Sequence, residues 1–380
     1  MANVIDYIKW RGDLSVTQDG FNEVDGLILS RASYFPFESL MEDNETVTFK
    51  EIGERYSKLD VKTLNILWPD DVYLIPAMGS SKRFGEMLVT KYDHKIVKEQ
   101  DIQYAAVTIL MPNDTIYVSY RGTDSTVVGW KEDLNMTFMT HVASQKEGVK
   151  YLEQVAKEFP NKKILVGGHS KGGNVAVYSA IYASKEVQDR IVTVYNNEGP
   201  GFNKEIIESK EYKQMINKVE TYIPQDSIFG RMLYNEGKYT VVKSNEFGVM
   251  QHDLYSWEIE GNKFIKLKEV TNGSKFIDKS LKDWLEQTDP KKREKVIEVV
   301  FEIINTTNIE SFKELMKNPI AKGKILLGSY KELDEETKDM IIKTITILFK
   351  IMKDNFVEET KLKTKTKKEG KKNVGAEQTV

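Results

Sequence analysis

One short segment constrains this chain more than any other. Residues 163–178 read KILVGGHSKGGNVAVY, where an apolar run leads into Gly168-His169-Ser170-Lys171-Gly172 and an apolar helical pattern follows. A G-x-S-x-G motif between a strand and a helix is typical of a tight turn that displays a nucleophilic serine. The backbone of such a turn is strained, so Gly168 and Gly172 must lack Cβ atoms. We therefore predict that Ser170 is a nucleophile and that the following helix directs free N–H groups at a developing oxyanion.

The alternative interpretation of this segment is a glycine-rich turn that contains a serine by chance. The strand before it, the helix after it and the additional Gly167 and Gly173 favour the nucleophile. His169 lies inside the turn, whose geometry directs it away from the reacting side of Ser170. We therefore expect His169 to pack under the sheet as a structural neighbour rather than act as the base.

Composition excludes several other kinds of chemistry. The chain of 380 residues has no cysteine, which removes disulfides, thiolate metal sites and a cysteine nucleophile. A formal net charge of −3 gives no reason to expect a nucleic-acid partner. The N-terminus lacks the apolar core of a signal peptide, and no apolar stretch approaches the roughly 20 residues of a membrane-spanning helix. We expect a cytoplasmic protein with no metal site and no cofactor.

Strand and helix patterns alternate after residue 104. Tyr104–Leu110 and Thr115–Tyr120 are apolar runs separated by a hairpin signal, Met111-Pro112-Asn113-Asp114. Further strands are predicted at Lys163–Val166, Ile191–Tyr195 and Lys218–Ile223, and helices at Gln145–Phe159, Gly172–Ser184 and Lys204–Ile216. This alternation predicts an α/β fold with a mostly parallel central sheet flanked by helices. The first hundred residues are harder to interpret. Asn22–Leu40 is typical of a buried helix, and residues 76–91 mix Gly and Ser with apolar residues and are expected to cover a site partly, like a lid.

The strand at Thr115–Tyr120 runs into a short polar loop, Arg121-Gly122-Thr123-Asp124. By composition alone this loop is a surface turn. However, a strand ending in an aromatic residue, then R-G-T and a later Trp and Asp (here Trp130 and Asp133), resembles the fungal-type (class 3) lipases. The resemblance implies that the backbone N–H groups of Thr123 and of Lys171, the residue after the nucleophile, form an oxyanion hole. A lysine at position 171 departs from the apolar residue of many lipases and leaves acyl-chain preference open.

The general base follows from elimination. The chain has four histidines, His94, His141, His169 and His252. In the α/β-hydrolase fold the order along the chain is nucleophile, acid, histidine, and only His252 follows Ser170. An isolated loop histidine is usually a bystander, but this order makes His252 the predicted base.

The acid has two candidates. Asp226 follows a β-like run that ends at Pro224, in a segment that resembles the D-x-V/I-P segment of class 3 lipases without its second proline. Its carboxylate would fix the histidine tautomer and stabilise the imidazolium. Glu198 ends the previous strand and is the main rival, although it reads more as pocket lining. Asp253 is adjacent to His252 and therefore poorly placed to hold its ring. We predict Asp226.

The ends of the chain extend beyond the lipase-like part, which covers roughly residues 100–260. The opening residues and the form G-H-S-K-G-G-N resemble the DUF2974 group of bacterial lipase-like proteins. We predict a hydrolase domain over residues 1–270, a helical subdomain over 274–358 that begins a helix at Pro290, a last helix at Glu335–Met352, and a basic disordered tail over 359–380. The apolar run Met340–Met352 is predicted as a core helix; the alternative is a membrane-surface helix whose Lys-rich tail contacts anionic lipid.

These features predict a serine carboxylester hydrolase acting on a lipid or another hydrophobic ester. Ser170, Asp226 and His252 are the expected triad, with supporting residues Arg121, Gly122, Asp124, Gly168, His169 and Gly172. An acyltransferase or thioesterase would use the same residues. A catalytically silent scaffold that binds a protein partner is the non-enzymatic alternative, and the oligomeric state is left open.

Overall fold

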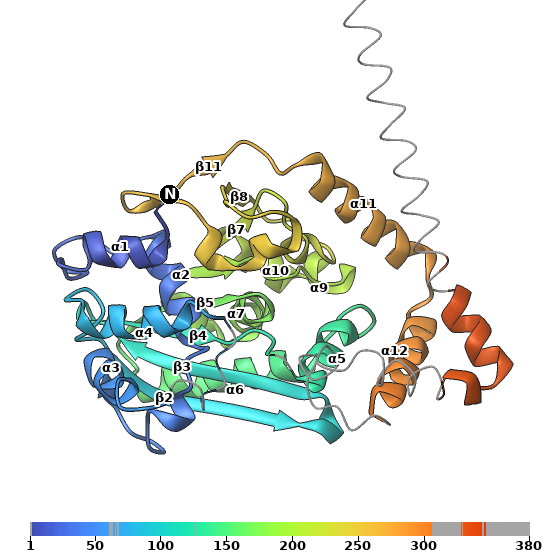
Figure 1. The fold of residues 1–380 in the computed structure, drawn as a ribbon, viewed down its shortest axis with the longest axis horizontal. Coiled ribbons are helices and arrows are strands. Elements are labelled where there is room, and N and C mark those ends of the chain that lie inside the picture. Colours follow the sequence, from blue (N-terminus) through green and yellow to red (C-terminus); the bar gives the residue numbers. More distant parts are fainter. Residues whose placement is uncertain are drawn as a thin grey trace, which may run out of the picture.

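A central sheet organises the computed structural model (Figure 1), which describes residues 2–60, 64, 66, 68–124, 126–305, 328, 330–343 and 346. Within these residues the sheet has nine strands in the order β1-β2-β3-β4-β5-β6-β7-β8-β11. Their bounds are Val47–Thr48 (β1), Leu88–Val97 (β2), Ile102–Leu110 (β3), Thr115–Tyr120 (β4), Lys163–His169 (β5), Ile191–Asn197 (β6), Val219–Pro224 (β7), Tyr239–Val242 (β8) and Lys266–Leu267 (β11). A separate small hairpin pairs Ile259–Glu260 (β9) with Lys263–Phe264 (β10).

The middle of the sheet is parallel. Strands β4 to β8 run in the same direction, and antiparallel strands β1, β2, β3 and β11 complete the two edges. The predicted α/β class, with a mostly parallel central sheet flanked by helices, is therefore confirmed. Because the carboxyl ends of parallel strands meet at one edge of a sheet, the loops after β4, β5, β6 and β7 gather there.

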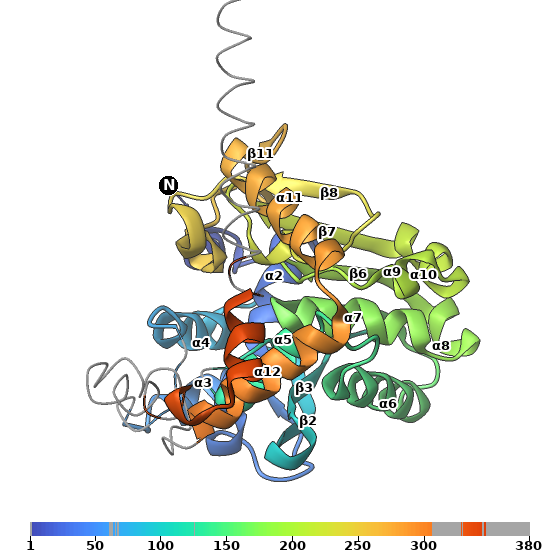
Figure 2. The same ribbon diagram turned by 90° about the vertical axis from the view of Figure 1, so that its right-hand side faces the viewer.

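Helices cover both faces of the sheet (Figure 2). Their bounds are Val4–Arg11 (α1), Glu23–Ala32 (α2), Phe49–Tyr56 (α3), Asp71–Ser80 (α4), Val127–Asn135 (α5), Ala143–Glu158 (α6), Lys171–Tyr182 (α7), Lys185–Arg190 (α8), Lys204–Glu208 (α9), Lys210–Met215 (α10), Asn272–Gln287 (α11) and Pro290–Asn305 (α12). Short 3-10 helices lie at Phe37–Ser39 (η1), Lys98–Gln100 (η3), Ile216–Lys218 (η4), Phe229–Arg231 (η5), Gly248–His252 (η6) and Leu254–Ser256 (η7).

Alternating side chains of the buried strands pack into two hydrophobic cores, one on each face of the sheet. In β4, Tyr117 packs with residues of α1 to α4, whereas Ile116 and Val118 pack with residues of α6, α7 and α10 on the opposite face. This is the period-two alternation of a strand that is buried on both faces. Each large apolar side chain buried in this way contributes roughly 1.5–3 kcal/mol.

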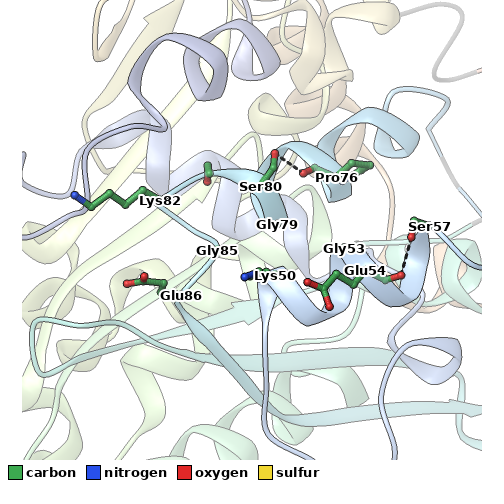
Figure 3. Close-up of a pocket in the computed structure, with 11 residues that line it drawn as sticks. Lys50, Gly53, Glu54, Ser57, Pro76, Gly79, Ser80, Lys82, Gly85 and Glu86 are labelled. Atoms are coloured by element: carbon green, nitrogen blue, oxygen red, sulfur yellow. Dashed lines mark hydrogen bonds between the residues drawn. The ribbon is translucent and has the colours of Figure 1, made fainter.

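Helices of the first hundred residues pack under the sheet. Buried ion pairs hold them: Arg83 Nε lies 2.7 Å from Asp25 Oδ1, and Arg31 Nε lies 2.7 Å from Asp71 Oδ1. Residues 76–91, which the sequence suggested as a partial cover, form the end of α4, a turn and the start of β2. With α3 they line a hollow of about 540 Å³ that no predicted site residue lines (Figure 3).

Two predicted elements differ in the structure. The helix predicted at Lys204–Ile216 is split into α9 and α10, because the Ser209 hydroxyl accepts from the Tyr212 N–H and caps a new helix. The strand predicted from Leu254 begins instead with η7, whose first turn is capped by the Asp253 carboxylate. The β pairing starts only at Ile259, in the β9–β10 hairpin.

The C-terminal helices pack beside α5. Helix α12 begins at Pro290 as predicted, and its Ile297 and Phe301 share a small apolar cluster with Val127 of α5. Of the helix predicted at Glu335–Met352, residues 335–343 and 346 are described and helical, and the rest, with the predicted tail, lies outside the described residues. The proposed division into a hydrolase domain and a helical subdomain stays a prediction. Among the described helices, none is both long and apolar enough to cross a bilayer.

Candidate active site

Ser170 occupies a sharp turn between β5 and α7. Its backbone has φ 58° and ψ −134°, a conformation that costs about 1–3 kcal/mol and persists only where the surroundings enforce it. The two glycines predicted to permit this turn are tightly enclosed. A Cβ on Gly168 would lie 2.2 Å from the Gly172 carbonyl carbon, and one on Gly172 would lie 2.1 Å from the Tyr120 oxygen. The strand, turn and helix are thus arranged as the motif predicted.

His252 is paired with a buried glutamate. Its Nδ1 lies 2.9 Å from Glu198 Oε2, and the Ser227 hydroxyl donates to the other carboxylate oxygen at 2.8 Å. Glu198 is 1% exposed and has a φ of 53°, immediately after β6. Because the carboxylate accepts a hydrogen bond from the Nδ1–H group, the Nε2 atom of His252 is left as an acceptor.

Asp226, the acid predicted from the sequence, does not contact His252. Its Oδ2 accepts from Gln251 Nε2 at 2.8 Å, its Oδ1 accepts from the Thr271 hydroxyl at 2.6 Å, and its own N–H donates to Gln251 Oε1. The structure therefore corrects the predicted pairing. Glu198 is hydrogen-bonded to the His252 ring, whereas Asp226 is hydrogen-bonded to Gln251, the residue before His252. The Asp253 carboxylate accepts from the Tyr255 N–H, in keeping with its expected exclusion.

The two acids could not be separated by their position in the sequence. Both follow the carboxyl ends of parallel strands, Glu198 after β6 and Asp226 after β7. What separates them is the loop between β8 and the small hairpin, which brings His252 over the end of β6. The order of residues along the chain does not encode that placement.

His169 supports His252 from beneath. Its ring is 1% exposed, its centroid lies 4.5 Å from that of His252, and its Nε2 lies 2.9 Å from the His252 carbonyl oxygen. Since a carbonyl can only accept, Nε2 carries the proton. Burial, together with the nearby His252 and Arg31, holds the pKa of His169 well below its usual range, so the ring is neutral. His169 therefore contacts the predicted base directly, through its ring and through a hydrogen bond to the His252 backbone, which the sequence did not predict.

The loop after β4 lies directly against Ser170. A Cβ on Gly122 would approach Ser170 Cβ to 3.1 Å, the His169 oxygen to 2.5 Å and the Tyr34 hydroxyl to 2.2 Å. The Gly122 N–H donates to Tyr34, whose hydroxyl in turn donates to the His169 carbonyl. Only glycine fits between the two turns, so the structure brings together the two segments that the sequence predicted to contribute oxyanion donors.

Partly buried side chains fix the rest of this loop. The Thr123 hydroxyl donates to Asp133 Oδ2 at 2.5 Å, and the Asp124 carboxylate accepts from the Thr126 N–H at 2.8 Å. Arg121 reaches Asp124 at 3.7 Å. Desolvation raises the pKa of Asp133 to about 6, against the opposing effects of Lys171 and Thr123.

The side chain of Lys171 is buried beneath the Arg121–Asp124 loop. Its Nζ donates to Glu132 Oε2 at 2.8 Å and to Gln103 Oε1 at 2.6 Å. The Gln103 amide nitrogen in turn donates to the Gly122 carbonyl at 3.3 Å. The charge of Lys171 is therefore neutralised inside the protein rather than exposed to an acyl chain. Sequence reasoning missed Gln103 and Glu132, because neither lies in a recognisable motif.

Two further features bear on what the site can bind. His169, Glu198 and His252 each offer one ligand atom within 4.8 Å of the others, a spacing that could hold a metal ion, although these residues already bond to one another as described. The hollow between α3 and α4 offers less: the hydroxyls of Ser57 and Ser80 bond to carbonyls of their own helices (Figure 3). We therefore place the candidate site at the strand ends.

The described residues thus form an α/β protein with a nine-stranded, mostly parallel sheet and a strained serine turn at the end of β5. A family model described as Mbeg1-like matches residues 78–302, more than half of the sequence, and the chain belongs to the Mbeg1-like family. No curated protein shows significant similarity to it.

Several solved fungal lipases have similar structures, with low sequence identity. A fungal lipase in an inhibitor complex is 15% identical with a TM-score of 0.32, covering 42% of this chain and 66% of that one. The Rhizomucor miehei lipase–propeptide complex is 17% identical with a TM-score of 0.31, covering 42% and 57%. A mutant form of MDLA from Penicillium cyclopium is 14% identical with a TM-score of 0.39, covering 66% and 87%. The chain thus spans less than two thirds of the length of the first two.

Proposed function

We propose that this protein is a serine hydrolase that cleaves carboxylic esters of hydrophobic acyl groups, and that Ser170, His252 and Glu198 form its triad. The observation that carries the proposal is the bond between His252 Nδ1 and the buried Glu198 carboxylate, 2.9 Å long, on the loops that surround the strained Ser170 turn. A buried acid that orients an imidazole beside a displayed serine is the arrangement that activates a serine nucleophile.

The reaction would proceed through an acyl-enzyme. Ser170 Oγ attacks the ester carbonyl while its proton passes to His252 Nε2, and Glu198 stabilises the imidazolium. The proton then passes from His252 to the departing alkoxide as the carbon–oxygen bond breaks. Water, deprotonated by the same histidine, attacks the acyl-enzyme and releases the acid and Ser170.

Backbone N–H groups of Thr123 and Lys171 are the proposed oxyanion donors. Lys171 follows the nucleophile at the first turn of α7, where helix N–H groups are free. Thr123 follows Gly122, which contacts the Ser170 turn. Loss of one such donor typically reduces kcat by about 10²–10³-fold.

Among the described residues, the Ser170 hydroxyl makes no hydrogen bond with a side chain or backbone group. Catalytic hydrogen bonds are often long before substrate binds and shorten in the complex, so this geometry is compatible with the proposed role. An acyl acceptor other than water would use the same triad, and the transfer reaction is therefore a variant of this proposal rather than a rival.

A fluorophosphonate probe tests the proposal. Wild-type protein should become labelled, and labelling should be lost in Ser170→Ala and His252→Ala. Ser80→Ala and His141→Ala serve as matched controls and should label normally, since His141 contacts Tyr178 and Tyr182 rather than the proposed site. If folded wild-type protein stays unlabelled both in buffer and in the presence of detergent, the hydrolase proposal fails and the scaffold interpretation takes its place.

A further inference from the structure

An apolar cavity of about 310 Å³ lies between α5, the residues after η5, and helices α11 and α12. Its walls include Leu134, Leu233, Trp284, Leu285, Val300 and Phe301. Both views of the fold place α11 and α12 on the side of the molecule that carries α5 (Figures 1 and 2). The volume is at the lower end of the roughly 300–1,000 Å³ typical of small-molecule sites.

The lining restricts what can enter. Thr137 is the single polar residue among those that line the cavity, and its hydroxyl already donates to the Leu134 carbonyl at 2.7 Å. A peptide segment would bury amide groups without partners, at about 1–3 kcal/mol each. A helix, with a diameter of about 10–12 Å, is too wide for this volume. The chemistry that fits is a hydrocarbon chain whose polar end stays outside.

Two segments that line the cavity are joined in the chain to residues of the candidate active site. Helix α5 begins at Val127, just after the Thr123–Asp124 loop. On the other side, the Phe229 ring in η5 lies 4.2 Å from the His252 ring, and Leu233 follows it in the chain. The cavity is therefore lined by the helix that follows the proposed oxyanion loop and by the residues that follow Phe229, whose ring contacts His252.

Helix α11 is anchored to the loop that holds the acid. The Ser274 hydroxyl of α11 donates to the Ser227 carbonyl at 2.6 Å, and the Ser227 hydroxyl donates to Glu198. Arg231 of η5 pairs with Asp278 of α11 at 2.5 Å. These bonds fix the position of α11 relative to Glu198 and His252. Helix α11 also supplies Trp284 and Leu285 to the lining of the cavity.

We propose that this cavity binds the hydrocarbon tail of a medium-length acyl chain. It has about twice the volume of an engineered 150 Å³ cavity that holds benzene, and so has room for roughly twelve carbon atoms. The inference deepens the proposed function and rests on it for the ester group to which the chain is attached.

Filling the cavity tests its role in substrate selection. Val300→Trp inserts an indole into the cavity, and Val192→Trp, at an exposed position on β6, is the matched control. In Val300→Trp, kcat/KM for p-nitrophenyl dodecanoate should fall by roughly tenfold or more, while that for p-nitrophenyl acetate stays within about twofold. Val300→Ala should shift the preference toward longer chains. Equal chain-length profiles in Val300→Trp, Val300→Ala and Val192→Trp would overturn the inference.

Direct binding separates this inference from the proposed function. A brominated dodecanoic acid should quench Trp fluorescence of the Ser170→Ala protein, and Trp284→Phe should remove most of that quenching. Quenching without any esterase activity or Ser170 labelling in wild type would support the cavity while the hydrolase proposal fails. Absence of Trp284-dependent quenching would overturn the inference even if esters are cleaved. The same fatty acid should also be tested on a chain truncated after residue 343. If the truncated chain binds it and the full chain does not, the cavity belongs to the chain's own C-terminal residues and the inference is overturned.

Discussion

The ammonium group of Lys171 lies 2.8 Å from the carboxylate of Glu132, and both side chains are 1% exposed. The residue whose N–H is a proposed oxyanion donor is therefore clamped through its own side chain. Gln103 accepts from the same ammonium group and donates to the Gly122 carbonyl, which connects the clamp to the neighbouring loop. A lysine in this position stabilises the geometry of the site and does not contact substrate through its charge.

Removing one partner of this pair should destabilise the fold. Glu132→Ala leaves the buried Lys171 charge with Asp133, 3.9 Å away, as its remaining acidic partner, and loss of one partner of a buried pair typically costs about 3–5 kcal/mol. The double variant Lys171→Met with Glu132→Leu should be more stable than Glu132→Ala, because it removes both charges of the pair. Urea unfolding of wild type and the variants measures this; a double variant no more stable than Glu132→Ala would contradict it.

Glu198 and Asp226 should differ sharply in their effect on catalysis. Glu198→Gln keeps the size of the side chain but cannot hold the required His252 tautomer, so kcat should fall by roughly 10²–10⁴-fold. Asp226→Asn, which alters contacts with Gln251, Thr271 and the Gly248 N–H but none with His252, should change kcat by less than about tenfold. Ester hydrolysis at pH 7–8 is the measurement. A larger loss in Asp226→Asn would restore the pairing predicted from the sequence.

Gly122 should tolerate no side chain. In Gly122→Ala the new methyl group meets Tyr34, the His169 carbonyl and Ser170 Cβ, so the oxyanion loop must shift. Displacements of about 1 Å at a catalytic site can cost about 10²-fold in rate. Gly20→Ala is the control, since an added Cβ there meets nothing within 4 Å. Esterase activity and thermal unfolding of both variants distinguish loss of geometry from loss of fold; equal activities would count against a close contact between Gly122 and the Ser170 turn.

Asp133 should make stability depend on pH. Its pKa is raised from 3.8 to about 6 by desolvation, so between these values the folded state binds more protons than the unfolded state. The stability contribution of Asp133 therefore decreases as pH rises from about 4 to 6, and is not recovered above that range. The stability of Asp133→Asn relative to wild type should accordingly increase over the same interval, as measured by urea unfolding at several pH values. A difference that is constant with pH would exclude this effect.

Local patterns predicted the parts of the protein that local physics determines. The β3–β4 hairpin, the Ser170 turn and the start of α12 at Pro290 each depend on residues adjacent in the chain, and each is present. Glu198 was recognised as a candidate but ranked second, because its contact with His252 spans 54 residues. Gln103 and Glu132 were missed because a buried polar network is defined by residues that are distant in sequence.

The buried helix expected within Asn22–Leu40 is present as α2, but its ion pairs could not be predicted, for a related reason. Helix α2 is buried nearly all round, including Asp25 and Arg31, so it lacks the polar face that gives a clear helical period. Its charges are compensated by Arg83 and Asp71, which are far away in the chain. Only the folded arrangement shows that these side chains form pairs rather than an exposed surface.

The order in which the site's parts occur along the chain also matters during synthesis. Gly122, Ser170 and Glu198 come from three consecutive parallel strands, whereas His252 follows much later, in η6. Because a protein is made from its N-terminus, a chain still on the ribosome holds the serine and its acid before it holds the base. In the proposed mechanism a nascent chain therefore cannot attack acyl groups until residue 252 has been added and has docked against Glu198.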